Sequence, residues 1–184
     1  RRPWPLVAPT AARYTDTAMP ASKSRIEKNL QAVRDAVVAA CDRAARDPAD
    51  VRILPVTKAV GMDEIKALLD LGLTDLGENR AGQLADRAAE LDAHLQRRRT
   101  PLTGPVRWHM IGHLQRNKVR KLLPAVSVIH SVDSLRLAEE LDTRAGQQDR
   151  TLDVLLEVNC AGEAQKHGCA VGAATHLAEL IHTL

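Results

Sequence analysis

Short apolar runs alternate with amphipathic segments along this 184-residue chain. The apolar runs are too brief for independent helices and predict buried strands at 51–57, 74–79, 106–112, 126–132 and 152–159. Helical spacing of apolar residues predicts helices at 22–46, 62–71, 81–95, 117–123, 134–146 and from 172 onward. The alternation predicts parallel β-α units in one α/β domain, either a doubly wound sheet or part of a barrel that closes with eight units.

Composition narrows the class of protein further. Lys and Arg exceed Asp and Glu by only 26 − 23 = 3, too little for a dedicated nucleic-acid binder. The aromatic residues are Trp4, Trp108 and Tyr14, so platforms for stacking single-stranded bases are absent. No apolar run approaches the roughly 18 residues of a membrane span. We therefore expect a soluble protein with neither a nucleic-acid nor a membrane partner.

The cysteines and the N-terminal segment indicate the cellular compartment and the bounds of the folded domain. Cys41, Cys160 and Cys169 form neither an even disulfide framework nor a close-spaced metal-ligand pair, which favours the cytoplasm. Residues 1–20 contain several prolines and no apolar segment of a signal peptide, and Met19 is a plausible natural start. We expect 1–20 to be a flexible tail and 21–184 to be the folded domain.

Lys58 follows the apolar run Ile53–Thr57 directly, and it is the first candidate for chemistry. Partial desolvation at the end of a buried strand favours the uncharged amine, which can form a Schiff base with a carbonyl compound. The alternative is a lysine whose ammonium extends from the strand end into solvent. Position alone does not decide between the two interpretations.

Polar residues also occur at the ends of other predicted strands. Asn79, His109 and Asn159 could meet Lys58 in one cavity, because ligands bind at the carboxyl ends of parallel strands. The alternatives are that Glu78 and Asn79 cap the following helix and that His109 is a hydrogen-bonded core histidine. His109 and His113 are four residues apart but lie on a strand and a loop, so we expect no metal site there.

Several segments together resemble a known family, the pyridoxal 5′-phosphate (PLP) homeostasis proteins of the YggS/PROSC type. The resemblance runs in order from about Ser22 to Leu184. The ten residues His109–Lys118 are its most specific part. The other matching segments are Val56–Lys58, Gly77–Asn79, Ser131–Ser134 and Val158–Gly168.

The resemblance implies a fold and a function. It implies a (β/α)8 TIM-barrel of the fold-type III PLP class, related to the N-terminal domain of alanine racemases. Lys58 would hold PLP as a Schiff base, Asn79, His109 and Asn159 would line the pocket, and Lys166 would assist cofactor movement. The alternative for Lys166 is a solvated charge on a loop. Family members buffer or deliver PLP, with PLP-dependent apo-enzymes as possible recipients. They are not known as efficient enzymes, so we expect no catalytic residues.

The chain departs from the family after the fifth predicted strand. The family continues with segments that grip the cofactor phosphate, and none of them is present here. We therefore expect an incomplete barrel of about five β-α units, with open sheet edges and weak PLP binding. A truncated, non-functional fragment is one alternative interpretation.

Two further hypotheses assign the chain to other classes of protein. A racemase-like PLP enzyme needs a second acid/base group, and racemases of this fold take it from a Tyr in another domain, whereas Tyr14 lies in the predicted tail. A basic interaction module would use Arg97–Arg99 and Arg116–Lys121, which are more typical of solvated surfaces.

Overall fold

The computed structural model describes residues 22–184. The predicted flexible tail at 1–20 lies outside the described residues, as do Met19 and Tyr14. Within the described part, no helix is both long and apolar enough to cross a membrane. Cys41, Cys160 and Cys169 are all free thiols.

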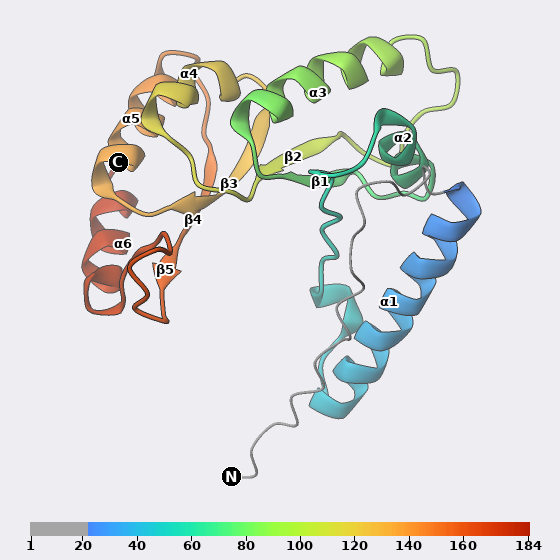
Figure 1. Cartoon of the computed structure of the whole chain (residues 1–184), viewed down its shortest axis with the longest axis horizontal. Coiled ribbons are helices and arrows are strands. Elements are labelled where there is room, and N and C mark those ends of the chain that lie inside the picture. Colours follow the sequence, from blue (N-terminus) through green and yellow to red (C-terminus); the bar gives the residue numbers. More distant parts are fainter. Residues whose placement is uncertain (1–21) are drawn as a thin grey trace.

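The described residues form helices and strands in the predicted alternation (Figure 1). The helices are α1 (Lys23–Ala44), α2 (Met62–Asp70), α3 (Ala81–Leu95), α4 (Val119–Leu122), α5 (Leu135–Gly146) and α6 (Ala174–His182). The strands are β1 (Asp75–Glu78), β2 (Arg107–Met110), β3 (Val126–Val132), β4 (Asp153–Leu156), β5 (Val158–Asn159) and β6 (Cys169–Ala170). Single 3₁₀ turns occupy Pro48–Asp50, Arg116–Lys118 and Val171–Ala173.

Local chemistry sets the ends of the first helices. Ser22 caps α1, because its hydroxyl oxygen accepts a hydrogen bond from the Arg25 N–H at 3.3 Å. The α2 helix ends in a Schellman motif, in which Gly72 adopts φ +82° and donates to the Leu69 carbonyl while Leu73 donates to the Leu68 carbonyl. A glycine is needed at this position because other residues are strained at positive φ.

The main sheet has four parallel strands in the order β1-β2-β3-β4, so each strand pairs with the next along the chain. The connecting helices α3, α4 and α5 lie on the same side of this sheet (Figure 1). Sequential order with one-sided helices is the arrangement of consecutive units in a β/α barrel, whereas a doubly wound sheet places helices on both faces. Within residues 22–184 the sheet is open.

The predicted strand 51–57 is reduced to a single bridge, between Val56 and Gly77. Two hydrogen bonds join the segment to β1, from the Thr57 N–H to the Gly77 carbonyl and from the Gly77 N–H to the Pro55 carbonyl, each 2.8 Å. Pro55 has no N–H to donate, and prolines are confined to the edges of sheets. The prediction of a buried strand over 51–57 is therefore wrong.

The predicted strand 152–159 divides into two. Glu157 separates β4 from β5, since its N–H donates to Val132 of the main sheet while its carbonyl accepts from Cys169, both at 2.8 Å. The β5 strand then pairs with β6 in a separate two-stranded parallel sheet, which the apolar pattern does not predict.

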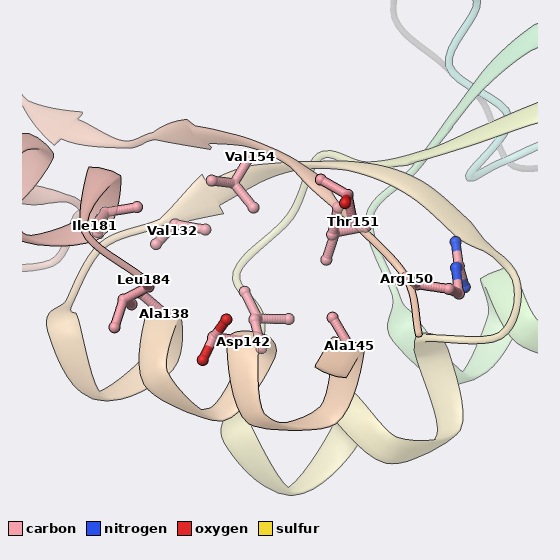
Figure 2. A pocket seen from close by; sticks show the side chains of 11 residues that line it. Val132, Ala138, Asp142, Ala145, Arg150, Thr151, Val154, Ile181 and Leu184 are labelled. Carbon is pink, nitrogen blue, oxygen red and sulfur yellow. The ribbon is translucent and has the colours of Figure 1, made fainter. Parts of the chain in front are cut away.

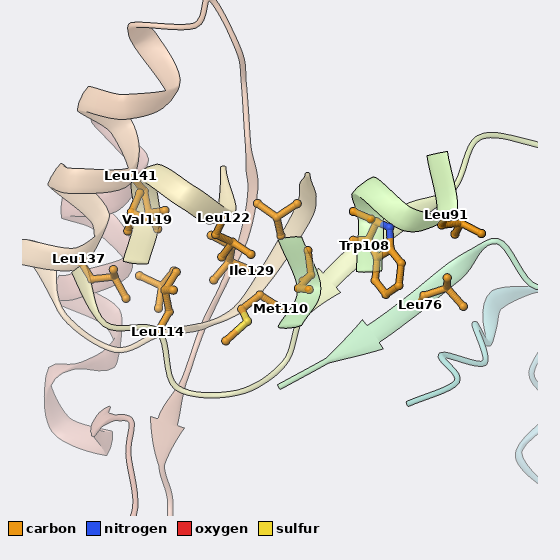
Figure 3. Close-up of a cluster of buried hydrophobic side chains, with 14 of the residues drawn as sticks. Leu76, Leu91, Trp108, Met110, Leu114, Val119, Leu122, Ile129, Leu137 and Leu141 are labelled. Atoms are coloured by element: carbon orange, nitrogen blue, oxygen red, sulfur yellow. The ribbon is translucent and has the colours of Figure 1, made fainter. Parts of the chain in front are cut away.

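The hydrophobic core fills the space between the helices and one face of the main sheet (Figure 3). Leu76, Trp108, Met110 and Ile129 from the strands are all buried there. Core side chains from the helices include Ile65, Leu84, Leu91, Leu122 and Leu141. Because side chains alternate between the two faces of a strand, Asp75, His109 and His130 point to the opposite face.

The helices at the two ends of the described chain are less well covered. In α1, Val33 and Val38 belong to the predicted apolar stripe, yet they are 48% and 44% exposed. Ile181 and Leu184 border a largely apolar recess of about 240 Å³ between α5 and β4 (Figure 2). The fully buried strand residues thus belong to β1, β2 and β3.

Candidate functional site

Lys58 lies in the loop that follows the bridged segment, at the carboxyl edge of the sheet. The preceding residue, Thr57, is fully buried, and its hydroxyl also donates to the Gly77 carbonyl at 3.1 Å. The Lys58 side chain, by contrast, is exposed. Within residues 22–184 its ammonium forms no ion pair or hydrogen bond. The expected desolvation is therefore absent, and the amine faces solvent without a competing partner.

A buried ion pair between Arg87 and Glu78 holds the Lys58 loop in place. Arg87 of α3 donates to the carbonyls of Thr57 and Val60, which flank Lys58 on either side. The same guanidinium contacts the carboxylate of Glu78 at 2.6 Å, and Glu78 is fully buried. A buried carboxylate needs such a partner because desolvation of an unpaired charge is very unfavourable. Sequence analysis missed both Glu78 and Arg87 as positioning residues.

Asn79 follows β1 directly, at the same edge of the sheet as Lys58. Its N–H donates to the Glu78 carboxylate at 2.8 Å, whereas its side-chain Oδ1 is buried and has no partner among the described residues. An unpaired buried acceptor is unfavourable, so this oxygen is free to receive a donor. Asn79 borders a cavity of about 600 Å³ that is also lined by Arg80 and Lys118.

Gly112 is required beside Asn79. A Cβ atom at Gly112 would lie 2.3 Å from the Asn79 carbonyl oxygen and 2.9 Å from its Cα. The two backbones can approach this closely only because glycine has no side chain. The loop between β2 and α4 is thereby held against the end of β1.

His109 occupies a different place from Asn79. It lies within β2, on the face of the sheet opposite the helices, and is almost fully buried. Its Nε2 is 2.8 Å from Asp75 Oδ1, and its Nδ1 is 2.9 Å from His130 Nε2. A carboxylate only accepts, so His109 Nε2 carries a proton and donates to Asp75, while one proton is shared between His109 Nδ1 and His130 Nε2. Both ring nitrogens of His109 are thus satisfied within the fold.

Electrostatics on this face favour the neutral ring of His130. Burial lowers the pKa of His130 below its usual value, and the positive charge that His109 can carry lowers it further. On the same face, Arg52 and Arg107 lie 3.9 Å and 4.0 Å from the carboxylate of Asp75. The Arg107 guanidinium also reaches Asp153 at 3.1 Å. These contacts link strands β1, β2, β3 and β4 across the open face.

Asn159 organises the loop that contains Lys166. The amide of Asn159 donates to the Glu163 carbonyl at 2.9 Å, and its oxygen accepts from the Gly162 N–H at 3.0 Å. Lys166 is exposed and forms an ion pair with Glu163 at 2.6 Å. Asn159 and Lys166 border a separate cavity of about 490 Å³.

The predicted site residues therefore do not meet in one cavity. Lys58 and Asn79 share the carboxyl edge of the sheet, His109 lies on its open face, and Asn159 and Lys166 belong to the β5–β6 loop. Sequence analysis also missed how His113 is placed. His113 does not contact His109. Its Nδ1 lies 3.4 Å from Asp133 Oδ2, and its ring stacks on that of His167.

Comparison with known proteins places this arrangement in a family, although no protein-family model matches the chain. The chain is 35% identical to the pyridoxal phosphate homeostasis protein of Pseudomonas aeruginosa, over 88% of this chain and 66% of that protein. It is 31% identical to the protein of the same name from Mycobacterium leprae, over 82% of this chain and 61% of the relative. The chain thus spans 61% to 66% of these relatives.

Solved structures agree with the sequence comparison. A protein of unknown function from Bifidobacterium adolescentis aligns with a TM-score of 0.80 and 36% identity, over 92% of this chain and 70% of that one. PipY of Synechococcus elongatus with PLP bound aligns with a TM-score of 0.60 and 29% identity, over 80% of this chain and 63% of PipY. From these similarities we conclude that the chain belongs to the family of pyridoxal phosphate homeostasis proteins.

Proposed function

We propose that this chain contributes the lysine-bearing part of a PLP homeostasis protein, which holds PLP reversibly and releases it to PLP-dependent apo-enzymes in the cytoplasm. The names of the relatives denote homeostasis rather than catalysis. PipY has been solved both without PLP and with it bound. We assign the chain a carrier role without catalytic residues on this basis.

The observation that carries the proposal is the setting of Lys58. Its backbone is anchored on both sides by Arg87, while its amine is exposed and has no partner among the described residues. PLP, when bound, supplies an aldehyde that reacts reversibly with a primary amine. A fixed backbone with a free amine suits reversible capture, because the loop does not have to reorganise when the ligand arrives or leaves.

Asn79 provides a second point of fit. Its unpaired Oδ1 lies at the same edge of the sheet as Lys58, so it can accept a hydrogen bond from a ligand or from a bound water. In the proposal, His109, Asn159 and Lys166 complete the pocket when the remaining strands of a (β/α)8 barrel close it. The sequential strand order and one-sided helices support such a closure.

Borohydride trapping tests the proposal. We expect incubation of the purified chain with PLP, followed by reduction and peptide mapping, to place a phosphopyridoxyl group on Lys58. The Lys58→Arg variant keeps the positive charge but cannot form the adduct, so the label should disappear. Lys28→Ala removes another exposed lysine, on α1, and should leave the label at Lys58 unchanged. Equal labelling of many exposed lysines in all three proteins would refute a dedicated site.

A further inference from the structure

Three side chains of the types that ligate metals meet at the carboxyl edge of the sheet. His113 follows β2, Asp133 follows β3 directly, and His167 precedes β6. Because β2 and β3 are neighbouring parallel strands, the residues that follow them emerge at the same edge. The loop that Asn159 organises brings His167 to the other two.

The geometry of this His113-Asp133-His167 cluster is close to that of a metal site. One ligand atom from each residue lies within 4.8 Å of the other two. His113 Nδ1 is 3.4 Å from Asp133 Oδ2, and the two imidazole rings stack with centroids 3.8 Å apart and planes inclined by 10°. Neighbouring ligands of a tetrahedral zinc ion are about 3.4 Å apart, given bonds of about 2.0–2.1 Å.

A neighbouring hydroxyl helps to orient the carboxylate. Ser134 Oγ donates to Asp133 Oδ1 at 3.2 Å, which leaves Oδ2 directed toward His113. Such partners fix the orientation of a ligating carboxylate. His167 is exposed, and its ring forms no hydrogen bond within residues 22–184, so only the stacking contact with His113 holds its orientation.

We propose that the His113-Asp133-His167 cluster binds a divalent transition-metal ion, with Zn²⁺ as the probe. Two imidazoles and one carboxylate are a ligand set that such ions take, with a further coordination position left for water or substrate. An imidazole lone pair lies in the plane of the ring. Binding therefore requires His167 to rotate out of the stack so that its nitrogen and that of His113 converge on one point.

Titration of the tag-free, PLP-free chain with Zn²⁺ in a calorimeter tests this proposal. We expect one ion per chain. His113→Ala, Asp133→Asn and His167→Ala should each weaken binding by about a hundredfold or more, since loss of an outer-shell partner alone weakens metal sites by about 10- to 100-fold. His176→Ala removes an exposed histidine of α6 as a matched control and should bind as the unmodified chain does.

Two further variants make the result specific. Cys160 is exposed and near His167 in sequence, so we would repeat the titration with Co²⁺ in the unmodified chain and in Cys160→Ser. A spectrum without a thiolate charge-transfer band, unchanged in Cys160→Ser, supports the cluster. Lys58→Ala should keep full metal affinity, which separates this proposal from PLP binding. Absence of stoichiometric binding, or equal affinity in His167→Ala and the unmodified chain, would overturn it.

Discussion

The two ends of the main sheet are held in place by different means. In β1 and β2, three consecutive residues of each strand are buried, and the Glu78–Arg87 ion pair fixes the adjacent loop from within. In β4 no residue is fully buried, and Leu155 is 52% exposed. The loop after β5 depends on local hydrogen bonds to the Asn159 amide. The Lys58 edge is therefore stabilised by packing, whereas the Lys166 loop is stabilised by short-range polar contacts.

The ion pairs of the two regions should contribute very different amounts to the free energy of unfolding. Glu78→Gln keeps the size of the side chain but leaves the Arg87 charge buried and uncompensated, so we expect the free energy of unfolding to fall by about 3 kcal/mol. Glu163→Gln removes the corresponding charge from the exposed pair with Lys166, and we expect a change below about 1 kcal/mol. Urea denaturation of both variants measures the difference, and equal losses would contradict the comparison.

Leucine truncation compares the packing of the same two regions. Leu84 of α3 is fully buried, so Leu84→Ala removes core contacts and leaves a cavity, with an expected loss of about 2–5 kcal/mol. Leu155→Ala deletes the same atoms from a half-exposed position, and we expect a loss below about 1 kcal/mol. Thermal or urea unfolding followed by circular dichroism measures both. A large loss in Leu155→Ala would show that β4 is covered in solution.

Disturbing the close backbone contact at the Lys58 edge should cause a smaller loss of stability. Gly112→Ala places a methyl group against the backbone of Asn79, which must shift, and we expect a loss of about 1–3 kcal/mol. Gly82→Ala, one residue after the start of α3, meets no atom within 4 Å and should be neutral or slightly stabilising. Similar stabilities for the two variants would mean that the two loops are not held together as closely as the structure indicates.

Sequence periodicity predicts the regular elements better than it predicts their edges. All the predicted helices are present within one or two residues of the expected bounds, because a helical spacing of apolar residues marks each of them in the sequence. The segment 51–57 is not a full strand, since Pro55 cannot donate and only one neighbour is present among the described residues. The β6 strand escapes prediction because its two residues become a strand only by pairing with β5.

The candidate site is predictable to a similar, partial extent. The rule that polar residues follow parallel strands locates Lys58 and Asn79 at one edge. It does not show that Arg87 from the middle of α3 anchors the Lys58 loop, because that contact joins residues about thirty positions apart. The meeting of His113, Asp133 and His167 depends in the same way on tertiary pairing, and neither grouping has a local sequence signal.

The free energy of unfolding should depend weakly on pH because of His130, which lies on the open face that joins the two regions. Burial and the nearby His109 lower the pKa of His130 in the folded state, so the unfolded chain binds a proton more readily there. Stability is then unaffected above the usual histidine pKa of about 6.5 and falls as the pH decreases below it.

The glutamine in His130→Gln does not titrate, so this variant should lose less stability between pH 7 and pH 5. The difference should be below about 1 kcal/mol because solvent screens a half-exposed ring. Urea midpoints of the two proteins across this range measure it, and the comparison cancels the histidines that do not contact His130. A steeper pH dependence in His130→Gln would mean that the ring is stabilised in its charged form, with Asp75 acting through His109 as the counter-ion.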